Sequence, residues 1–245
     1  MSEPELLHIG TSGWHYKHWR GPFYPEDLPD EDLLKHYLKY FHTAETNNTF
    51  YQLPEKETFT RWRDSVPESF IFSVKASRYI THMKKLKDPE QPLTNFITGI
   101  KELGEKLGPI LFQLPPRWHL NIERLRGFLR ALPEGHRYAF EFRDESWFEK
   151  QAEEALRDRG VAFCMYDFEH RESPHSVTTD FVYVRLHGPD GAYQGKYDDQ
   201  TLKRWAKDFS SWVNDGKDVF CYFDNDEKGY AAQNALRLKE LLGGK

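Results

Sequence analysis

Short hydrophobic runs alternate along the chain with longer stretches in which apolar and polar positions follow a helical period. The runs predict strands at Leu7–Ser12, Thr43–Thr49, Phe70–Lys75, Pro109–Leu114, Arg137–Arg143, Val161–Asp167, Phe181–His187 and Val219–Asn225. The amphipathic stretches predict helices at Asp32–Phe41, Lys56–Val66, Leu93–Leu107, Ile122–Leu132, Glu149–Arg159, Gln200–Asn214 and Gly229–Leu242.

Eight strands that alternate with helices predict an α/β fold, a TIM (β/α)8 barrel in which residues 1–245 form a single domain. Only Phe168–Thr179 lacks a clear helical pattern, so the sixth helix is expected to be weak or missing. A doubly wound open sheet is the competing architecture. It would be indicated by a glycine-rich nucleotide motif, and neither G-x-G-x-x-G nor G-x-x-x-x-G-K-[ST] occurs in the chain.

Charged residues in the predicted strands share one face. In the fifth strand, two phenylalanines alternate with Glu141 and Arg143. In the seventh, aliphatic residues alternate with Arg185 and His187, and Lys75 ends the third strand. Because successive side chains of a strand point to opposite faces, the charged face is expected to line the barrel interior. Each charge lies near the C-terminal end of its strand, where TIM-barrel enzymes carry their active sites.

The same alternation selects further polar residues for this mouth of the barrel. They are Thr11, Gly13, Glu45, Asn47, Gln113, Asp167 and Asn225. Burying so many charges is costly unless they pair with one another or bind a ligand. Two interpretations are therefore open: a ligand site, or a closed ion-pair network that only fixes the strands.

Several segments resemble a known family. They are Ile9–Trp14, Glu45–Tyr51, Phe72–Ala76, Leu111–Pro116, Phe140–Arg143 with Ser146 and Trp147, Val184–Gly188, Tyr222–Asp226, Gly229–Ala231 and Asn234–Ala235. In this order, over nearly the whole chain, they are similar to the YecE-like family, domain of unknown function number 72. The resemblance implies a TIM-barrel fold and leaves the function open.

Three cations at one mouth predict an anionic ligand. Arg143 and Arg185 offer planar forks suited to phosphate or carboxylate, and Lys75 offers a point charge. Gln113, Asn47 and Asn225 are expected to orient this ligand. Aromatic residues on the neighbouring loops are expected to stack on flat or sugar-like groups of the ligand; among them we predict that Trp14, Tyr51 and Trp147 bind substrate.

Glu45, Glu141 and His187 are the candidate catalytic residues. Two carboxylates across a mouth can act as an acid–base pair, as in glycoside hydrolysis. Glu141 lies beside Arg143, which favours a base or an ion-pair role over an acid. His187 is a reasonable general base at neutral pH. The sequence therefore predicts hydrolase-like acid–base chemistry on an anionic substrate that contains a phosphate or a sugar.

We expect no metal and no other cofactor. His15, His18, His170 and His175 lie on mouth-side loops, but their spacings match no zinc motif. Three nearby cations also oppose a bound cation. Two alternatives stay open: a nucleic-acid-binding module without turnover, and a metal-dependent phosphodiesterase of the endonuclease IV type. The predicted partner is accordingly a small anionic molecule or a nucleic acid, and the oligomeric state is left open.

Composition and hydrophobic pattern restrict the cellular location of the protein and the kind of partner it can bind. The net charge of -5 argues against a protein that coats nucleic acid by bulk charge. The longest apolar run, Val161 to Tyr166, is far shorter than a membrane span, and the N-terminus lacks the pattern of a secretory signal. Two cysteines inside apolar runs are expected to be free thiols. These features predict a cytoplasmic protein with no membrane partner.

Overall fold

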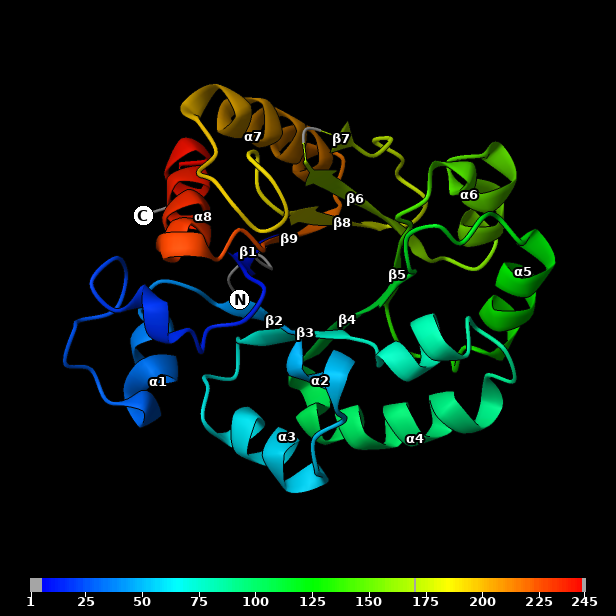
Figure 1. Cartoon of the computed structure of the whole chain (residues 1–245), viewed down its shortest axis with the longest axis horizontal. Coiled ribbons are helices and arrows are strands. Elements are labelled where there is room, and N and C mark those ends of the chain that lie inside the picture. Colours follow the sequence, from blue (N-terminus) through cyan, green and yellow to red (C-terminus); the bar gives the residue numbers. More distant parts are fainter. Residues whose placement is uncertain (1–5, 170, 244–245) are drawn as a thin grey trace. The chain divides into compact units, whose positions relative to one another are not determined.

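The computed structural model describes residues 6–169 and 171–243. Eight parallel strands with helices between them form an α/β barrel of the TIM type, as the sequence predicts. The strands are β1 (Leu7–Thr11), β2 (Thr43–Thr46), β3 (Ile71–Lys75), β4 (Leu107–Gln113), β5 (Tyr138–Glu141), β6 (Ala162–Phe168), β8 (Phe181–Leu186) and β9 (Asp218–Phe223) (Figure 1).

The hydrogen-bonded order of the strands is β1-β9-β8-β6-β5-β4-β3-β2. A parallel bridge between Ser12 and Glu45 joins β1 to β2, the two strands at the ends of this order. Gly10 allows the close approach there, because a Cβ atom at position 10 would lie 2.3 Å from the carbonyl oxygen of Thr43.

The described chain divides into two compact units. Unit 1 comprises Met1–Glu45, Met165–Ser173 and Asp180–Lys245, and unit 2 comprises Thr46–Cys164 and Pro174–Thr179. Two of the boundaries fall within β2 and β6, and the other two lie between β7 and β8. The single domain expected from the sequence stays a prediction.

Unit 1 contains α1 (Leu33–Tyr37), α7 (Asp199–Asn214) and α8 (Tyr230–Leu241). Helices α7 and α8 contact each other and β9, and α8 also contacts β1 (Figure 1). Short 3-10 helices occur at Lys17–Trp19, Asp30–Asp32 and Glu227–Gly229. Apolar residues of α7, among them Leu202, Trp205 and Phe209, are buried, as expected for an amphipathic helix over a sheet.

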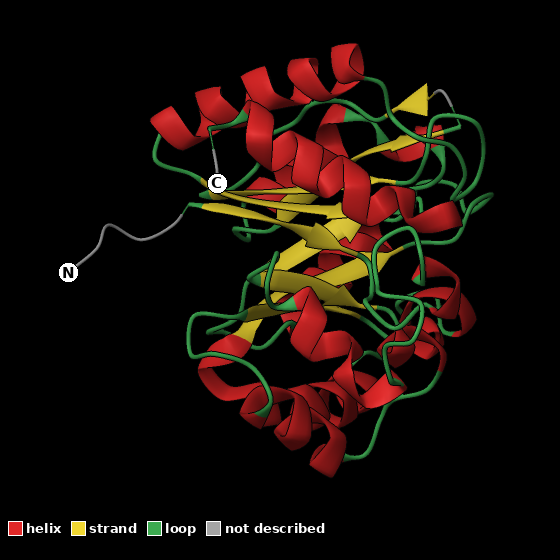
Figure 2. Cartoon of the chain, turned by 90° about the vertical axis from the view of Figure 1, so that its left-hand side faces the viewer, coloured by secondary structure: helices red, strands yellow, loops and turns green. Residues whose placement is uncertain are grey.

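Unit 2 contains α2 (Asn48–Tyr51), α3 (Lys56–Asp64), α4 (Glu90–Ile100), α5 (Ile122–Ala131) and α6 (Lys150–Arg157). A π-helix spans Tyr79–Met83, and 3-10 helices span Lys101–Lys106 and Glu145–Trp147. In both units the strands are flanked by helices (Figure 2).

One expectation about the elements is confirmed, and one predicted strand ends earlier than expected. The described residues between β6 and β8 form a short strand β7 (Arg171–Glu172), antiparallel to β6, and no helix; the weak sixth helix is thus confirmed for these residues. The second strand was expected to extend to Thr49. It ends at Thr46 because the chain turns into α2 at Asn48, with Asn47 at the helical N-cap position.

Both cysteines, Cys164 and Cys221, are buried free thiols, and burial raises the pKa of the Cys221 thiol well above its usual value. Among the described residues, no helix is long and apolar enough to cross a lipid bilayer. The cytoplasmic location stays a prediction.

Candidate active site

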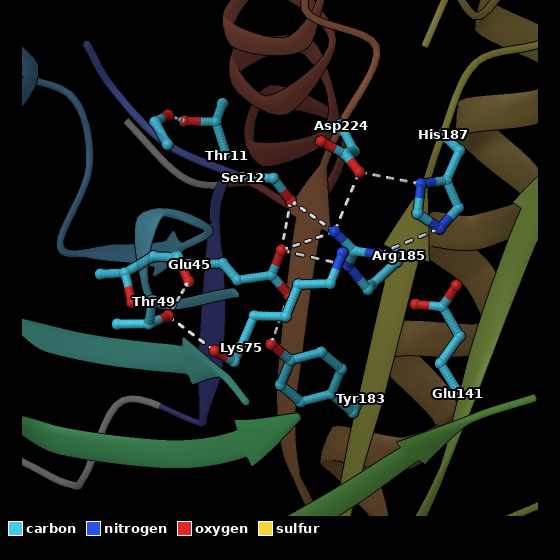
Figure 3. A network of polar contacts seen from close by, with 12 residues as sticks. Thr11, Ser12, Glu45, Thr49, Lys75, Glu141, Tyr183, Arg185, His187 and Asp224 are labelled. Atoms are coloured by element: carbon cyan, nitrogen blue, oxygen red, sulfur yellow. Dashed lines mark hydrogen bonds and ion pairs between the residues drawn. The ribbon is translucent and has the colours of Figure 1, made fainter. Parts of the chain in front are cut away.

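A buried network of charged side chains lies at the C-terminal ends of the strands of unit 1, with Arg185 of β8 at its centre (Figure 3). Arg185 Nη2 lies 2.7 Å from Glu45 Oε1 and 2.9 Å from Asp224 Oδ2. The side chains of Arg185 and Glu45 are completely buried. Two carboxylates thus neutralise this guanidinium. This matches one of the two interpretations left by the sequence, the closed ion-pair network. We use the name Arg185 network for Ser12, Glu45, Tyr183, Arg185, His187 and Asp224.

Glu45 is held on both carboxylate oxygens. Oε1 accepts hydrogen bonds from Ser12 Oγ at 2.6 Å and from Arg185 Nε and Nη2, and Oε2 accepts one from Tyr183 OH at 2.7 Å. Burial, together with the charge of Glu45, raises the pKa of Tyr183 well above its usual value, so this phenol stays a donor. The arrangement suits a carboxylate that positions Arg185 better than one that transfers a proton.

His187 directly follows β8 and is completely buried. Its Nε2 lies 3.4 Å from Arg185 Nη1, and its Nδ1 lies 3.0 Å from Asp224 Oδ2. Because a guanidinium can only donate, the first contact requires Nε2 to accept, which leaves the ring hydrogen on Nδ1 for Asp224. In this arrangement Nε2 faces the guanidinium and Nδ1 faces a carboxylate, and the role of His187 as a general base stays a prediction.

Three members of the Arg185 network, Ser12, Tyr183 and Asp224, were not among the residues selected from the sequence, and the reason is plain for Asp224. Strict alternation along the eighth predicted strand selected Asn225, but β9 ends at Phe223, so the alternation no longer holds beyond it. Asn225 instead donates from Nδ2 to the Gly195 carbonyl and to Asn234 Oδ1. Within the described chain its buried Oδ1 has no hydrogen-bond partner, so the predicted contact between Asn225 and substrate stays a prediction.

Asp226 is a second carboxylate near the end of β9, with 29% of its side chain exposed. Burial raises its pKa, and the charge of Asp224 raises it further. The Asp226 carbonyl accepts hydrogen bonds from Trp19 Nε1 and contacts His18 Nε2, both at 2.8 Å, which fixes this loop. The two aspartates therefore occupy different environments: Asp224 is buried and hydrogen-bonded, and Asp226 is partly exposed with a raised pKa.

In unit 2 the charged pair predicted on β5 is present. Arg143 Nε contacts Glu141 Oε1, and both side chains are nearly or completely buried. Gln113 of β4 is in register with Glu141, so these two lie on neighbouring strand ends. Alternation along the strand thus placed Glu141 and Arg143 correctly on one face, although β5 itself ends at Glu141.

Lys75, at the end of β3, lies over an aromatic ring. Its Nζ is 4.5 Å from the centroid of Phe50, and only 7% of the residue is exposed. The Lys75 carbonyl accepts a hydrogen bond from Thr49 Oγ1 at 2.6 Å, which ties β3 to α2 (Figure 3). Phe50 also packs against the His82 ring, with centroids 5.0 Å apart. Asn47, just before α2, has a buried Oδ1 with no hydrogen-bond partner among the described residues.

Burial lowers the pKa of His82 to about 4, with the charges of Lys75 and Arg78 acting in the same direction. His82 is therefore neutral in the fold at a pH at which an unfolded histidine, with a pKa near ~6.5, binds a proton. Stability is complete above that unfolded pKa and falls as the pH drops from about 6.5 towards 4. We expect His82→Gln to reduce the loss of unfolding free energy on acidification by about 1 kcal/mol, allowing for partial solvent exposure.

Denaturant unfolding at a series of pH values would measure this effect. The exposed His42, replaced by glutamine, is the control and should leave the acid dependence as in the parent protein. Parallel acid profiles for His82→Gln and the parent would contradict the assignment.

Of the three rings predicted to bind substrate, the structure exposes one. Trp147 is completely buried and stacks on Phe142 with centroids 4.9 Å apart, and Trp14 is 9% exposed. Tyr51, by contrast, is 73% exposed. Two of the three rings are thus buried, and substrate binding by Trp14, Tyr51 and Trp147 stays a prediction.

The described residues contain no group of three or more histidine, cysteine, aspartate or glutamate side chains placed to hold a metal ion. His170, one of the loop histidines weighed for such a site, lies outside the described residues.

Comparison with known proteins assigns the chain to a family. The family model described as "Protein of unknown function DUF72" matches residues 8–245. The protein belongs to the DUF72 family.

Two curated relatives and one solved structure are similar to this DUF72 protein. It is 27% identical to the UPF0759 protein YunF of Bacillus subtilis, over 97% of this chain and 95% of the relative. It is 30% identical to the UPF0759 protein YecE of Escherichia coli K12, over 70% of this chain and 63% of the relative. The crystal structure of a DUF72 family protein from Thermotoga maritima superposes with a TM-score of 0.89 at 31% identity, covering 98% and 100% of the two chains. The resemblance expected from the sequence is thus confirmed.

Proposed function

We propose that this DUF72 protein is an enzyme whose acid–base chemistry is carried out beside the Arg185 network, on an anionic substrate that contains a phosphate or a sugar. The observation that carries the proposal is the network itself. Arg185, Glu45 and His187 are fully buried at strand C-terminal ends, although burying charges usually costs more than packing apolar groups there. A site for chemistry is a reason to keep them.

The proton donor in this proposal is Asp226. Perturbed carboxylates in unlike environments are typical of acid–base pairs in active sites. Asp226 is partly exposed with a raised pKa, and Asp224 is held by Arg185 and His187. Glu45 and His187 then act as positioning residues.

Unit 2, taken by itself, offers side chains that suit an anion. Lys75 and Arg143 are two cations at strand ends, accompanied there by the carboxylate of Glu141. Charge-assisted hydrogen bonds from such groups are the usual means of holding a phosphate or a carboxylate. Gln113 and Asn47, also of unit 2, would orient the neutral part of an anion bound there.

The test is a panel of chromogenic phosphate monoesters, phosphodiesters and glycosides offered to the full chain. We expect Asp226→Asn to lower the turnover of any substrate found by about 100-fold while leaving its affinity for inorganic phosphate unchanged. Lys75→Ala should weaken phosphate binding about tenfold, because one charge-assisted hydrogen bond is worth roughly 1.5 kcal/mol or more.

Asp215→Asn is the matched control, since Asp215 is an exposed aspartate of unit 1 just after α7. Full turnover by Asp226→Asn would rule out Asp226 as the donor, and hydrolysis of no member of the panel would count against an enzyme of this class.

A nucleic-acid-binding module is the second candidate. The observation in its favour is Tyr51, a largely exposed ring at the end of α2 that could stack on a base. An oligonucleotide in the same panel, bound without turnover and more weakly by Tyr51→Ala, would favour this function over the enzyme.

A further inference from the structure

The chain between β8 and α7 (yellow in Figure 1) forms a loop next to His187. Four of its residues have positive φ: Gly188 at 116°, Gly191 at 157°, Tyr193 at 64° and Gly195 at 84°. Glycine adopts such angles freely, but a tyrosine does so at a cost in free energy. The contacts of Tyr193 must therefore offset the free-energy cost of its positive φ.

The base of this loop is anchored at both ends. Gly188 N donates to Tyr197 OH at 2.9 Å. At the other end, Gly195 N donates to Glu227 Oε2 at 3.2 Å, and the Gly195 carbonyl accepts from Asn225 Nδ2 at 2.8 Å. The fully buried Asn225 thereby links the loop to the end of β9.

The tip, residues 189–194, is held differently. Its backbone contacts run within the tip, from Gln194 N to the Gly191 carbonyl at 3.2 Å and from Asp190 N to the Gln194 carbonyl at 3.4 Å. The second distance is long for a hydrogen bond between backbone groups. The tip is thus a tight turn on an anchored base, with Gly188 and Gly195 at its two junctions. Such a segment can move as a rigid unit about its junctions.

The ring of Tyr193 covers His187. Its centroid lies 5.9 Å from the His187 ring and 6.2 Å from the Phe168 ring. Phe168 also packs edge-on against His187 at 5.5 Å. His187 is completely buried, whereas Tyr193 is 41% exposed, so Tyr193 is the solvent-facing ring of this cluster.

We propose that residues 189–194 are a lid over the Arg185 network, with Tyr193 as the ring that closes it. Opening the tip uncovers His187 and, beyond it, Asp224. The lid deepens the proposed function, since it controls access to the same site, but its test needs no substrate and no turnover.

The readout is solvent access to His187, measured as hydrogen–deuterium exchange at C2 of its imidazole by mass spectrometry of the full chain. We expect Tyr193→Ala to speed this exchange roughly threefold or more, because the ring that separates His187 from solvent is lost. Tyr193→Phe should leave the rate unchanged. Tyr40→Ala, which removes another exposed tyrosine of unit 1, is the control.

Gly195→Ala opens the lid from its base. A Cβ atom at position 195 would lie 2.3 Å from Asp190 Oδ2 and 2.9 Å from Asp190 Cβ, so rotating the carboxylate is not enough and Asp190 must move away from position 195. Gly216→Ala is matched to it, since Gly216 has a similar φ of 74° but nothing within 4 Å of an added Cβ atom. Faster exchange at His187 in Gly195→Ala and not in Gly216→Ala is the expected result.

Unchanged exchange at His187 in either Tyr193→Ala or Gly195→Ala, with the thermal midpoint retained, would overturn the lid. Exchange that responds as expected, in a protein that hydrolyses nothing in the substrate panel, would leave the lid standing and remove the proposed function alone.

Discussion

Arg185→Ala is expected to lower the free energy of unfolding by about 3–5 kcal/mol, the usual effect of removing one partner of a buried ion pair. The substitution leaves Glu45 and Asp224 without their shared cation, and Glu45 is completely buried. Arg185→Lys should recover only part of this loss, because an ammonium cannot reproduce the fork that contacts both carboxylates. Urea unfolding at neutral pH would measure both variants.

Arg237→Ala is the control for this experiment. Arg237 also pairs with two acidic residues, Asp199 and Glu240, but its side chain is 40% exposed. Exposed pairs contribute little, so a change within about 1 kcal/mol is expected. An Arg185→Ala protein as stable as its parent, but with weakened phosphate binding, would instead show that Arg185 serves a ligand and not the network.

Trp147→Ala is expected to destabilise the protein by about 3–5 kcal/mol, as large-to-small substitutions of buried aromatic residues do. The ring is fully buried, stacks on Phe142, contacts the Trp118 ring at 5.3 Å and donates from Nε1 to the Trp118 carbonyl. Thermal unfolding followed by circular dichroism would measure the loss.

Tyr51→Ala provides the contrast, since an exposed ring away from the core should change stability by no more than about 0.5 kcal/mol. If Trp147→Ala kept the parent's stability and lost ligand affinity, the ring would be a substrate contact, as the sequence had suggested, and not a core residue.

Sequence pattern alone is sufficient to predict the regular strands and the charged residues on them. Short hydrophobic runs predicted all eight barrel strands. Alternation then placed Glu141 with Arg143, and Arg185 with His187, because those residues lie in or directly after regular strands. It failed at Asp224, which lies after β9 has ended, where the loop conformation and not the strand period directs the side chain.

The partners of each charge were beyond the reach of the pattern. Alternation shows that Arg185 and Glu45 share a face, but it does not show that Ser12 and Tyr183 complete the shell of Glu45. Similarly, a tryptophan on a loop looks the same in sequence whether it faces solvent, as was expected for Trp147, or packs inside. Only the tertiary contacts separate these cases.

The Arg185 network also has a consequence for the folding kinetics. Arg185 contacts residues 140, 173 and 39 positions away in the sequence, at Glu45, Ser12 and Asp224. Contacts between such distant residues require long loops to close first, and loop closure lowers the conformational entropy of the chain. They are therefore expected to form after the main folding barrier, so that the network contributes chiefly by slowing the unfolding of the native protein and only slightly by speeding its formation.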